Sequence, residues 1–411
     1  MPGISAARMM SRCEALAACS EQPGGLTRVF LSPEQRAANE RVLAWMREAG
    51  MSARLDAIGN CVGRYEGQRP GLPALLLGSH LDTVRDAGKY DGMLGVVAAI
   101  ECVHALNETG RRLPFAVEVI GFADEEGVRF NATLIGSRAV AGKLEPEVLD
   151  AVDGAGVSLR QALKDFGLDP ARVGEAARER QEILAYAELH IEQGPVLEAK
   201  GLPAGVVTAI NGVTRLAAEI DGTAGHAGTV PMKLRRDALA AAAECALAVE
   251  RRCANGSDLV GTVGRIEALP GAVNVIPGKA RFTIDVRASG DAARASAVDE
   301  LCAEMKAVCA RRGVAIVLRK THENRVAACA PWLMEQLGAA LAAEGLPVCR
   351  LPSGAGHDGM AMVDLCDIGM LFIRCEKGIS HNPAEAITAA DAETGARSFL
   401  RFIESFRAER R

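Results

Sequence analysis

The sequence predicts an α/β protein in which a mostly parallel sheet is interrupted by a smaller α+β domain. Short apolar runs alternate with helical patterns through the first half of the chain, which is typical of a parallel sheet covered on both faces. From residue 213 to residue 327 the predicted order changes to βαββαβ. The 411 residues, 49% of them hydrophobic, suffice for two or three domains with a large buried core.

The first part of the chain is predicted to contain helices followed by three buried strands. Residues 1–60 are expected to be helical, and within them Ser32 before Pro33 is typical of a helix N-cap. A short polar strand pair is expected around NCVGRYEG, and a helix over GMLGVVAAIECVHAL. The buried strands are the apolar runs ALLLGSH (74–80), FAVEVIGFAD (115–124) and YAELHIEQG (186–194).

The middle of the chain is predicted to fold as its own domain. Its order of strands and helices is that of the ferredoxin-like unit. After residue 327 helix and apolar strand patterns return. We therefore expect one domain built from residues 1–212 and 328–411, with residues 213–327 inserted into it.

The charge and composition exclude several classes of protein. The net charge is −5, so neither a basic nucleic-acid surface nor a polybasic membrane anchor is expected. No apolar stretch is long enough to span a bilayer, and the N-terminal residues lack the pattern of a secretory signal. The 12 cysteines are scattered without a C-x-x-C pair and are expected to be reduced thiols. The expected location is the cytoplasm.

The first polar cluster follows the strand 74–80. His80 and Asp82 lie two residues apart, so their side chains point the same way, and Asp82 is placed to orient a metal-binding histidine. Asp91 follows in a glycine-flanked loop and could reach the same point. The alternative is a histidine at a strand end followed by two ordinary loop acids.

The second cluster, Asp124, Glu125 and Glu126, stands directly after a buried strand, where an open α/β sheet places its ligand crevice. Three adjacent carboxylates repel one another unless a cation neutralises them. Because neighbouring residues diverge, one glutamate can bind metal while the other faces an open coordination position. The alternative is a solvated acidic loop.

Two further histidines complete a possible metal centre. His190 lies in LHIEQG and His381 in GISHNPAE, each at or after a buried strand. Together with the carboxylates they would suit two closely spaced divalent ions, namely zinc, manganese or cobalt. A water shared by such ions would lose a proton near neutral pH and become a nucleophile.

The motifs along the chain, taken together, resemble those of a known family. HLD, KYDG, DEEG, LHIEQGP, GTAGHAGTVPM, GAVNVIPG, SGAGHDG and SHNP occur in the order seen in dinuclear metallohydrolases of the N-carbamoyl-L-amino acid hydrolase, β-ureidopropionase and allantoate amidohydrolase type. The resemblance covers nearly the whole chain. It implies an aminopeptidase-like catalytic domain, an inserted dimerisation (lid) domain and a homodimer.

The resemblance also implies the roles of individual residues. His80 and His190 would hold one ion, Glu126 and His381 the other, with Asp91 bridging both and Glu125 serving as general base and then general acid. The implied substrate contacts are Gln193, His226, Asn274 and Arg287.

The chemistry of these substrate contacts agrees with the resemblance. Arg287 can form a two-pronged bond with a carboxylate, His226 could approach an oxyanion, and Asn274 offers both donor and acceptor to a ureido group. The alternatives are a strand-end arginine in a surface ion pair and a turn asparagine. His357, in a glycine-rich loop, could help bind the substrate carboxylate or simply turn the chain. Because three of the contacts lie on the inserted domain, the site is expected to assemble when the domains close.

Two motifs favour allantoate as the substrate. ADEEGVRF is similar to the form found in allantoate amidohydrolases, and GGLTRVFLSPEQ resembles their T-R-x-x-x-S-P-E run. The expected reaction, a step of purine catabolism, converts allantoate to ureidoglycine, ammonia and carbon dioxide. The alternatives are an N-carbamoyl-L-amino acid hydrolase or β-ureidopropionase, a dipeptidase on the same scaffold, and a catalytically silent homologue.

Overall fold

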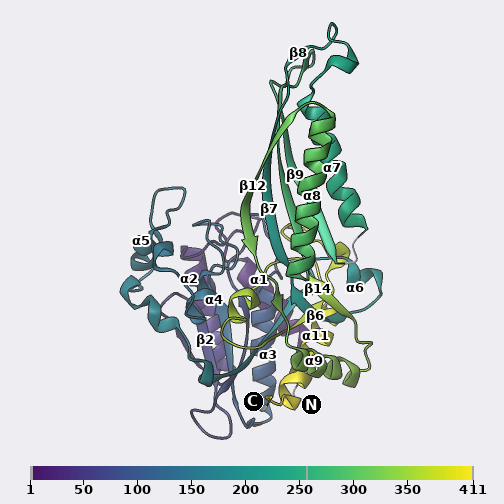
Figure 1. The fold of residues 1–411 in the computed structure, drawn as a ribbon. Coiled ribbons are helices and arrows are strands. Elements are labelled where there is room, and N and C mark those ends of the chain that lie inside the picture. Colours follow the sequence, from purple (N-terminus) through teal and green to yellow (C-terminus); the bar gives the residue numbers. More distant parts are fainter. Residues whose placement is uncertain (1–2, 256–257, 410–411) are drawn as a thin grey trace. The chain divides into compact units, whose positions relative to one another are not determined.

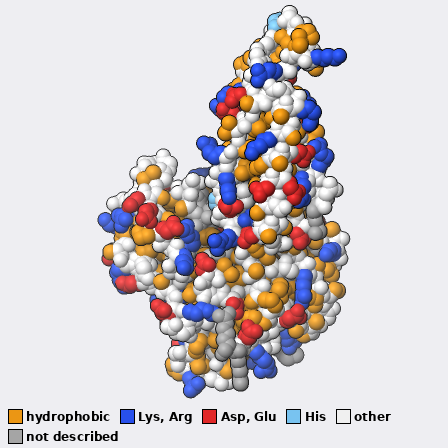
Figure 2. All heavy atoms as spheres, viewed as in Figure 1, with side chains coloured by type: hydrophobic (Ala, Val, Ile, Leu, Met, Phe, Trp, Pro, Cys, Tyr) orange, Lys and Arg blue, Asp and Glu red, His pale blue; other side chains and the backbone are white. Residues whose placement is uncertain are grey.

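The chain forms two units in the computed structural model, which describes residues 3–255 and 258–409. Unit 1 contains the residues up to Thr208 and those from Ala328 onward, and unit 2 is Ala209–Ala327 (Figure 1). Among the described residues, no helix is long and apolar enough to cross a membrane. On the face drawn in Figure 2, acidic and basic side chains are interspersed.

Unit 1 is built on a nine-stranded sheet in the order β1-β2-β4-β3-β5-β15-β6-β13, with β14 paired to β6. The strands are β1 (Ser52–Leu55), β2 (Cys61–Tyr65), β3 (Ala74–His80), β4 (Ala116–Phe122), β5 (Ile183–Ile191), β6 (Ala204–Ile210), β13 (Ala327–Ala328), β14 (Arg350–Ser353) and β15 (Ile368–Ile373). The central strands β4, β3, β5 and β15 pair in parallel. This confirms the predicted α/β fold with a mostly parallel sheet.

Every residue of β3, β4 and β15 is buried, as expected for strands covered on both faces. The helices of unit 1 are α1 (Ala6–Ala17), α2 (Pro33–Glu48), α3 (Met93–Glu108), α4 (Ile135–Val140), α5 (Leu159–Asp165), α6 (Val196–Ala199), α9 (Pro331–Ala343), α10 (Gly359–Met362) and α11 (Ala389–Ser405). Short 3-10 helices occupy Pro146–Asp150, Pro170–Ala176, Arg180–Glu182 and Glu376–Gly378.

The predicted start of α2 is confirmed, whereas the expectation of helix throughout residues 1–60 is wrong at its end. The hydroxyl of Ser32 accepts the N–H of Gln35 at 3.1 Å, and Pro33 occupies the first turn. Strand β1 follows α2, because Ser52–Leu55 pairs antiparallel with β2. The segment between β4 and β5 holds α4, α5 and 3-10 turns around a small apolar cluster, where the sequence patterns indicated no elements.

Unit 2 contains the βαββαβ order that the sequence predicts. Its antiparallel sheet has the order β12-β7-β11-β9. The elements are β7 (Gly212–Asp221), α7 (Ala238–Ala254), β9 (Leu259–Leu269), β11 (Lys279–Ala288), α8 (Asp291–Arg311) and β12 (Ala315–Asn324), with a small ladder of β8 (Gly225–His226) and β10 (Val275–Ile276) and a 3-10 turn at Met232–Leu234. Helices α7 and α8 lie side by side along the sheet (Figure 1) and share an apolar core with it.

Candidate metal centre

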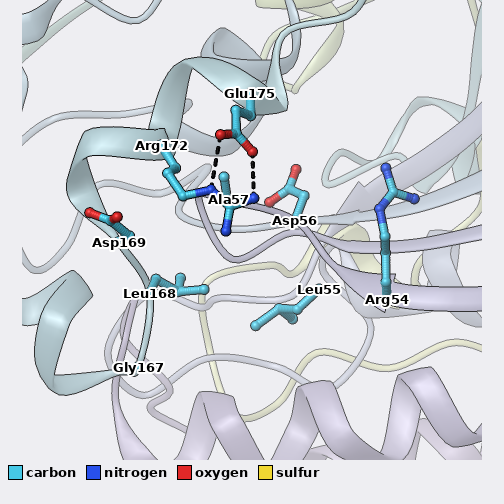
Figure 3. Close-up of a pocket in the computed structure, with 9 residues that line it drawn as sticks. All are labelled: Arg54, Leu55, Asp56, Ala57, Gly167, Leu168, Asp169, Arg172 and Glu175. Atoms are coloured by element: carbon cyan, nitrogen blue, oxygen red, sulfur yellow. Dashed lines mark hydrogen bonds and ion pairs between the residues drawn. The ribbon is translucent and has the colours of Figure 1, made fainter.

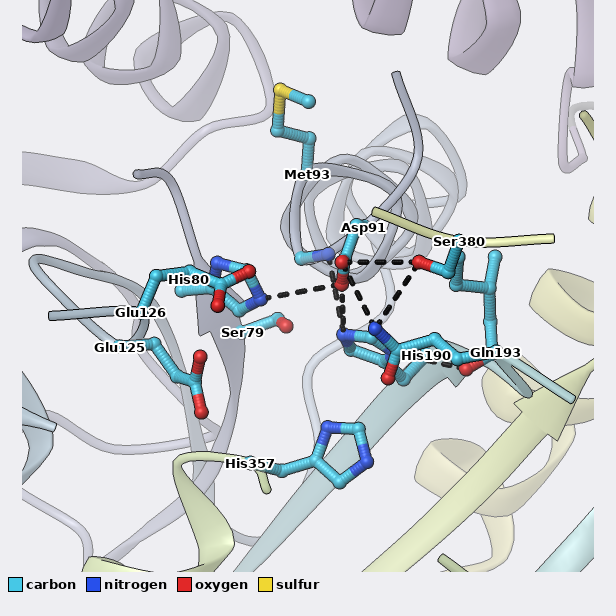
Figure 4. Close-up of polar contacts among 12 residues, drawn as sticks. Ser79, His80, Asp91, Met93, Glu125, Glu126, His190, Gln193, His357 and Ser380 are labelled. Atoms are coloured by element: carbon cyan, nitrogen blue, oxygen red, sulfur yellow. Dashed lines mark hydrogen bonds and ion pairs between the residues drawn. The ribbon is translucent and has the colours of Figure 1, made fainter. Parts of the chain in front are cut away.

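The predicted metal ligands of unit 1 meet at the carboxyl edge of its parallel sheet. His80 is the last residue of β3, Glu125 and Glu126 follow β4, and His190 is near the end of β5. These strands are neighbours in the sheet, in the order β4-β3-β5. Parallel neighbours end at the same edge, so residues far apart in the sequence converge there (Figure 4).

Asp91 lies at the middle of this group and faces histidines with both carboxylate oxygens. Its Oδ1 atom is 3.2 Å from Nε2 of His190 and 3.6 Å from Nε2 of His80. Its Oδ2 atom is 3.1 Å from Nε2 of His381, and that nitrogen is 3.4 Å from Oε1 of Glu126. Two sets of potential ligands therefore share Asp91: His80, Asp91 and His190 form one, and Asp91, Glu126 and His381 the other, with the donor atoms of each set within 4.8 Å of one another.

Backbone carbonyl groups orient two of the histidines. Nδ1 of His80 lies 3.1 Å from the carbonyl oxygen of Asp82, and Nδ1 of His190 lies 2.9 Å from that of Ile191. A carbonyl only accepts, so Nδ1 carries the proton when each ring is neutral, and Nε2 keeps its lone pair, which in His190 accepts the backbone N–H of Gly92 at 3.2 Å. This is the tautomer that a metal-binding histidine needs.

The carboxylate of Asp82 has a different task from the one that the sequence suggested. Its Oδ1 atom is 3.7 Å from Nδ1 of His80, too far for a hydrogen bond. Instead the carboxylate accepts the backbone N–H groups of Glu125 at 2.9 Å and Glu126 at 3.1 Å. Asp82 therefore supports His80 through its carbonyl oxygen and fixes the acidic loop through its side chain.

The acidic groups of the centre fit divalent cations. Burial, reinforced by Glu126, raises the pKa of Glu125 well above its usual value, and burial raises the pKa of Glu126 to about 7. Burial also acts to raise the pKa of Asp91, but the rings of His190, His381 and His80 that face its oxygens hold it well below its usual value. Buried carboxylates thus crowd a site whose donors are imidazole and carboxylate, the set that zinc, manganese and cobalt accept.

Gln193 and His357 also lie in this centre (Figure 4). Gln193, whose backbone is left-handed at φ 55°, donates from Nε2 to Oδ2 of Asp91 at 2.9 Å. The ring of His357 is buried, with its centroid 4.4 Å from that of His190, and Nε2 lies 2.8 Å from the hydroxyl of Ser353. Burial, with His190 nearby, lowers the pKa of His357 well below its usual value, so the ring is neutral.

Two residues of the centre escaped the sequence reasoning, although both lie in the GISHNPAE motif. The carboxylate of Glu385 is buried and accepts the backbone N–H groups of Tyr90 at 2.8 Å and Asp91 at 3.1 Å. It also accepts the hydroxyl of Ser380 at 2.8 Å. The loop of His381 is thereby tied to the loop of Asp91.

The three predicted substrate contacts of unit 2 do not lie together within that unit. His226 pairs with Val275 in the β8–β10 ladder, and the N–H of Ala227 donates to the carbonyl of Asn274 at 2.9 Å. His226 and Asn274 are both exposed. Arg287 lies near the far end of β11, ~26 Å along the strand from Lys279 at about 3.3 Å per residue.

Arg287 already makes the two-pronged bond that its chemistry predicts, but with a residue of its own strand. Nε donates to Oδ1 of Asp285 at 2.8 Å and Nη2 to Oδ2 at 3.2 Å. Arg215 also donates to Asp285, at 2.9 Å. Although burial acts to raise the pKa of Asp285, these hydrogen bonds keep it below its usual value.

A separate depression of unit 1, of about 380 Å³, is lined by a different kind of residue set from that of the metal centre (Figure 3). Three of its charged groups bond to the protein itself: Arg172 donates to both oxygens of Glu175, at 2.9 and 2.7 Å, and Asp56 accepts three backbone N–H groups of its own turn. The lining residues are Arg54, Leu55, Asp56, Ala57, Gly167, Leu168, Asp169, Arg172 and Glu175.

The fold and the centre define the class of protein. Two histidine–carboxylate sets share one aspartate at the carboxyl edge of a parallel sheet, and a further glutamate, Glu125, lies beside them. This arrangement is that of a metal-dependent hydrolase.

Comparison with known proteins identifies the family. The chain belongs to peptidase family M20/M25/M40, whose model matches residues 76–405. It is 42% identical to the N-carbamoyl-L-amino acid amidohydrolase of Geobacillus stearothermophilus over 96% of each chain. It is 39% identical to the allantoate deiminase of Arabidopsis thaliana over 96% of this chain and 81% of that one. A crystal structure of an amidase of the hydantoinase/carbamoylase family from Burkholderia multivorans matches with a TM-score of 0.92, 30% identity and 98% coverage of both chains. These matches confirm the family resemblance and a hydrolase acting on C–N bonds.

Proposed function

We propose that the protein hydrolyses the ureido C–N bond of a small carboxylate, and that its substrate is allantoate, giving ureidoglycine, ammonia and carbon dioxide. The observation that carries the proposal is the pair of ligand sets sharing Asp91 with Glu125 beside them. The similarity to N-carbamoyl-L-amino acid amidohydrolases and allantoate deiminases supports a carbamoyl compound as the substrate.

In the proposed centre His80 and His190 hold one divalent ion, Glu126 and His381 hold the other, and Asp91 serves both. Divalent ions bound there act as Lewis acids and lower the pKa of water. The acids that support these ligands, Asp82 and Glu385, bond to backbone N–H groups of the ligand loops rather than competing for the ions.

Glu125 is the proposed general base. Its side chain is 9% exposed, and a carboxylate oxygen lies within 4.8 Å of donor atoms of both His80 and Glu126. It takes a proton from the attacking water as the new C–O bond forms, and returns that proton to the leaving nitrogen as the C–N bond breaks. Burial raises the pKa of Glu125 well above its usual value, which makes its protonated form a better-populated donor for the leaving nitrogen than an ordinary glutamic acid would be.

The proposed substrate contacts are Gln193 and His357 in unit 1, and His226, Asn274 and Arg287 in unit 2. Neutral His357 and the amide of Gln193 offer hydrogen bonds without adding charge to the centre. Arg287 would bind the substrate carboxylate by sharing or exchanging its bond with Asp285. The proposed assembly is a homodimer, as the family resemblance implies.

A second candidate is hydrolysis of N-carbamoyl-L-amino acids. The 42% identity to a carbamoyl amidohydrolase over 96% of each chain favours it. Both reactions use the same metal ligands, base and carboxylate contact, so the substrate alone distinguishes them.

Ammonia release tests the proposal. Manganese-loaded enzyme is given allantoate, N-carbamoyl-L-amino acids, N-carbamoyl-β-alanine and a dipeptide at matched concentrations. Because hydrolysis of a dipeptide yields amino acids and no ammonia, the dipeptide reaction is followed by the release of free amino acids. A preference for allantoate of about a hundredfold, the scale of discrimination that pocket contacts provide, would support the leading proposal. A similar preference for a carbamoyl amino acid would favour the second candidate. Cleavage of the dipeptide alone would refute both.

A further inference from the structure

Arg28 is a buried cation that the proposed reaction does not use. It belongs to the LTRVFLSPEQ segment (residues 26–35), and its side chain is fully buried in unit 1. Burial lowers the pKa of its guanidinium to about 10, so the group still carries its charge at neutral pH. Among the residues that the structure describes, no carboxylate lies within ion-pair distance of it, and burial outweighs the more distant charge of Asp82. A buried charge without a paired charge is unfavourable, so its hydrogen bonds must account for its presence.

The guanidinium of Arg28 bonds to three segments at once. Nε donates to the carbonyl of Leu81 at 2.7 Å. Nη1 donates to the carbonyls of Leu16 at 2.6 Å and Cys19 at 3.0 Å, at the end of helix α1. Nη2 contacts Sδ of Met93, the first residue of α3. The guanidinium spreads five N–H donors over a rigid planar fork that spans these acceptors, whereas an ammonium group offers three donors on a single compact atom.

Two of these segments carry metal ligands. Leu81 lies between His80 and Asp82, and Met93 is two residues beyond Asp91. In Figure 4 the side chain of Met93 points away from the histidines of the ligand cluster. Arg28 therefore contacts the backbone behind His80 and the start of the helix that follows Asp91.

The backbone of Arg28 strengthens the same connection. Its N–H donates to the hydroxyl of Thr83 at 2.9 Å, and its carbonyl accepts the N–H of Thr83 at 3.0 Å. The carbonyl of Leu26 accepts the N–H of Ala87 at 2.8 Å. The segment 26–28 thus runs beside the chain that leads from His80 toward Asp91.

We propose that Arg28 is a positioning residue of the metal centre. Its guanidinium, together with the backbone hydrogen bonds between Arg28 and Thr83, holds the turn after His80 and the segment after Asp91 against helix α1. Arg28 thereby sets the positions of two ligands that serve the same ion. This inference rests on the proposed metal centre.

The test compares Arg28→Lys and Arg28→Met with a matched control, Arg12→Lys. Arg12 is also nearly buried on α1, but it bonds to Glu48 at 3.1 Å and lies over the ring of Trp45, and so it holds α1 to α2 rather than to the ligand segments. Three quantities are measured on the full-length protein: thermal stability, zinc affinity by competition with a chelator, and the visible absorption spectrum of the cobalt-substituted protein.

All three variants are expected to lose thermal stability. Only the Arg28 variants are expected to bind zinc more weakly, by about 10- to 100-fold, and to change the cobalt spectrum, as loss of a group that orients ligands does. If their zinc affinity and cobalt spectrum match those of Arg12→Lys, Arg28 is merely structural and the inference fails.

Two further results are decisive. If the Arg28 variants do not fold, Thr83→Val is used, because it removes the hydroxyl that accepts the N–H of Arg28 while preserving size. It should weaken zinc binding in the same direction, and unchanged binding would overturn the inference. If the wild-type protein binds no divalent ion, the proposed function itself fails, which is distinct from variants that bind as the wild type does.

Discussion

Glutamine in place of Glu125 separates the chemistry of this residue from its effect on stability. The substitution preserves side-chain size, and the backbone N–H at this position stays bonded to Asp82 at 2.9 Å, so the loop should keep its place. Loss of a general base lowers turnover by about two to four orders of magnitude. At about 1.36 kcal/mol per order, the barrier rises by ~2.7 to 5.4 kcal/mol.

The same substitution should stabilise the metal-free protein. Glu125 and Glu126 present carboxylate oxygens within 4.8 Å of each other and of a His80 nitrogen. For two ionised groups at that distance, an effective dielectric constant of about 20 gives a repulsion of ~3 kcal/mol. The pKa of both glutamates is raised, so the pair is partly protonated in the metal-free protein and this repulsion is an upper limit. Glutamine removes this repulsion, so the metal-free variant should melt above the metal-free wild type. Bound cations should shrink the difference.

The assay is ammonia release at saturating substrate, with metal content measured on the same preparation. Turnover that falls together with metal content would show that Glu125 binds metal rather than acting as the base. Unchanged turnover with full metal content would refute the assignment of the base. A metal-free variant that melts below the wild type would refute the repulsion argument.

Three other predictions follow from the same geometry. Asp91→Asn should reduce the content of both ions, because Asp91 faces both ligand sets, whereas His381→Ala should spare one of them. The metal content of each variant is measured by mass spectrometry. If the Asp91→Asn protein keeps two ions, Asp91 is not a shared ligand. Arg287→Lys should raise KM for the carboxylate substrate about tenfold or more with little change in kcat, since lysine lacks the two-pronged geometry; an unaltered KM would remove that role. Asp285 should stabilise the protein by about 1 kcal/mol or less, as a partly exposed ion pair does. Its lowered pKa makes this stabilisation present above about pH 4, and it disappears as the pH falls through the folded-state value, so the gap in Tm between wild type and Asp285→Asn should close in acid.

The features of the fold that depend on local pattern could be predicted from the sequence. Strands buried on both faces read as continuous apolar runs, so β3, β4 and β5 were predicted within a few residues. The segment between β4 and β5 could not be predicted in the same way. Its short α-helices and 3-10 turns leave too few residues for a period to show.

The convergence of His80, Asp91, His190, Glu126 and His381 was predictable because parallel strands deliver their ends to one edge. The hydrogen bonds around them were not. Asp82 could equally have bonded to a ring or to backbone N–H groups, and Glu385 acts on Asp91 across 294 positions of the sequence. Such long-range choices have no signal in local spacing.

The structure also gives physical reasons for the two motifs that favoured allantoate. Asp124 in DEEG is fully buried with a left-handed backbone at φ 57°, a conformation that aspartate and asparagine both tolerate. In the T-R-x-x-x-S-P-E run, Arg28 bonds to backbone carbonyls and Ser32 caps α2. These residues have roles within the fold and do not distinguish one substrate from another. The activity comparison therefore decides which substrate the protein uses.

The chain enters and leaves unit 2 on neighbouring strands, so unit 2 could be removed from unit 1 or replaced. The chain leaves unit 1 along β6 and returns along β13, the neighbouring strand of the same sheet, where the N–H of Cys329 donates to the carbonyl of Thr208 at 3.0 Å. The two ends of the insertion are therefore adjacent, and a short turn could join them. All five proposed metal ligands and Glu125 would remain in the shortened protein. The proposed metal centre and three of the proposed substrate contacts would thus reside in separate modules, and grafting a relative's insertion onto this scaffold could alter substrate choice without rebuilding the metal centre.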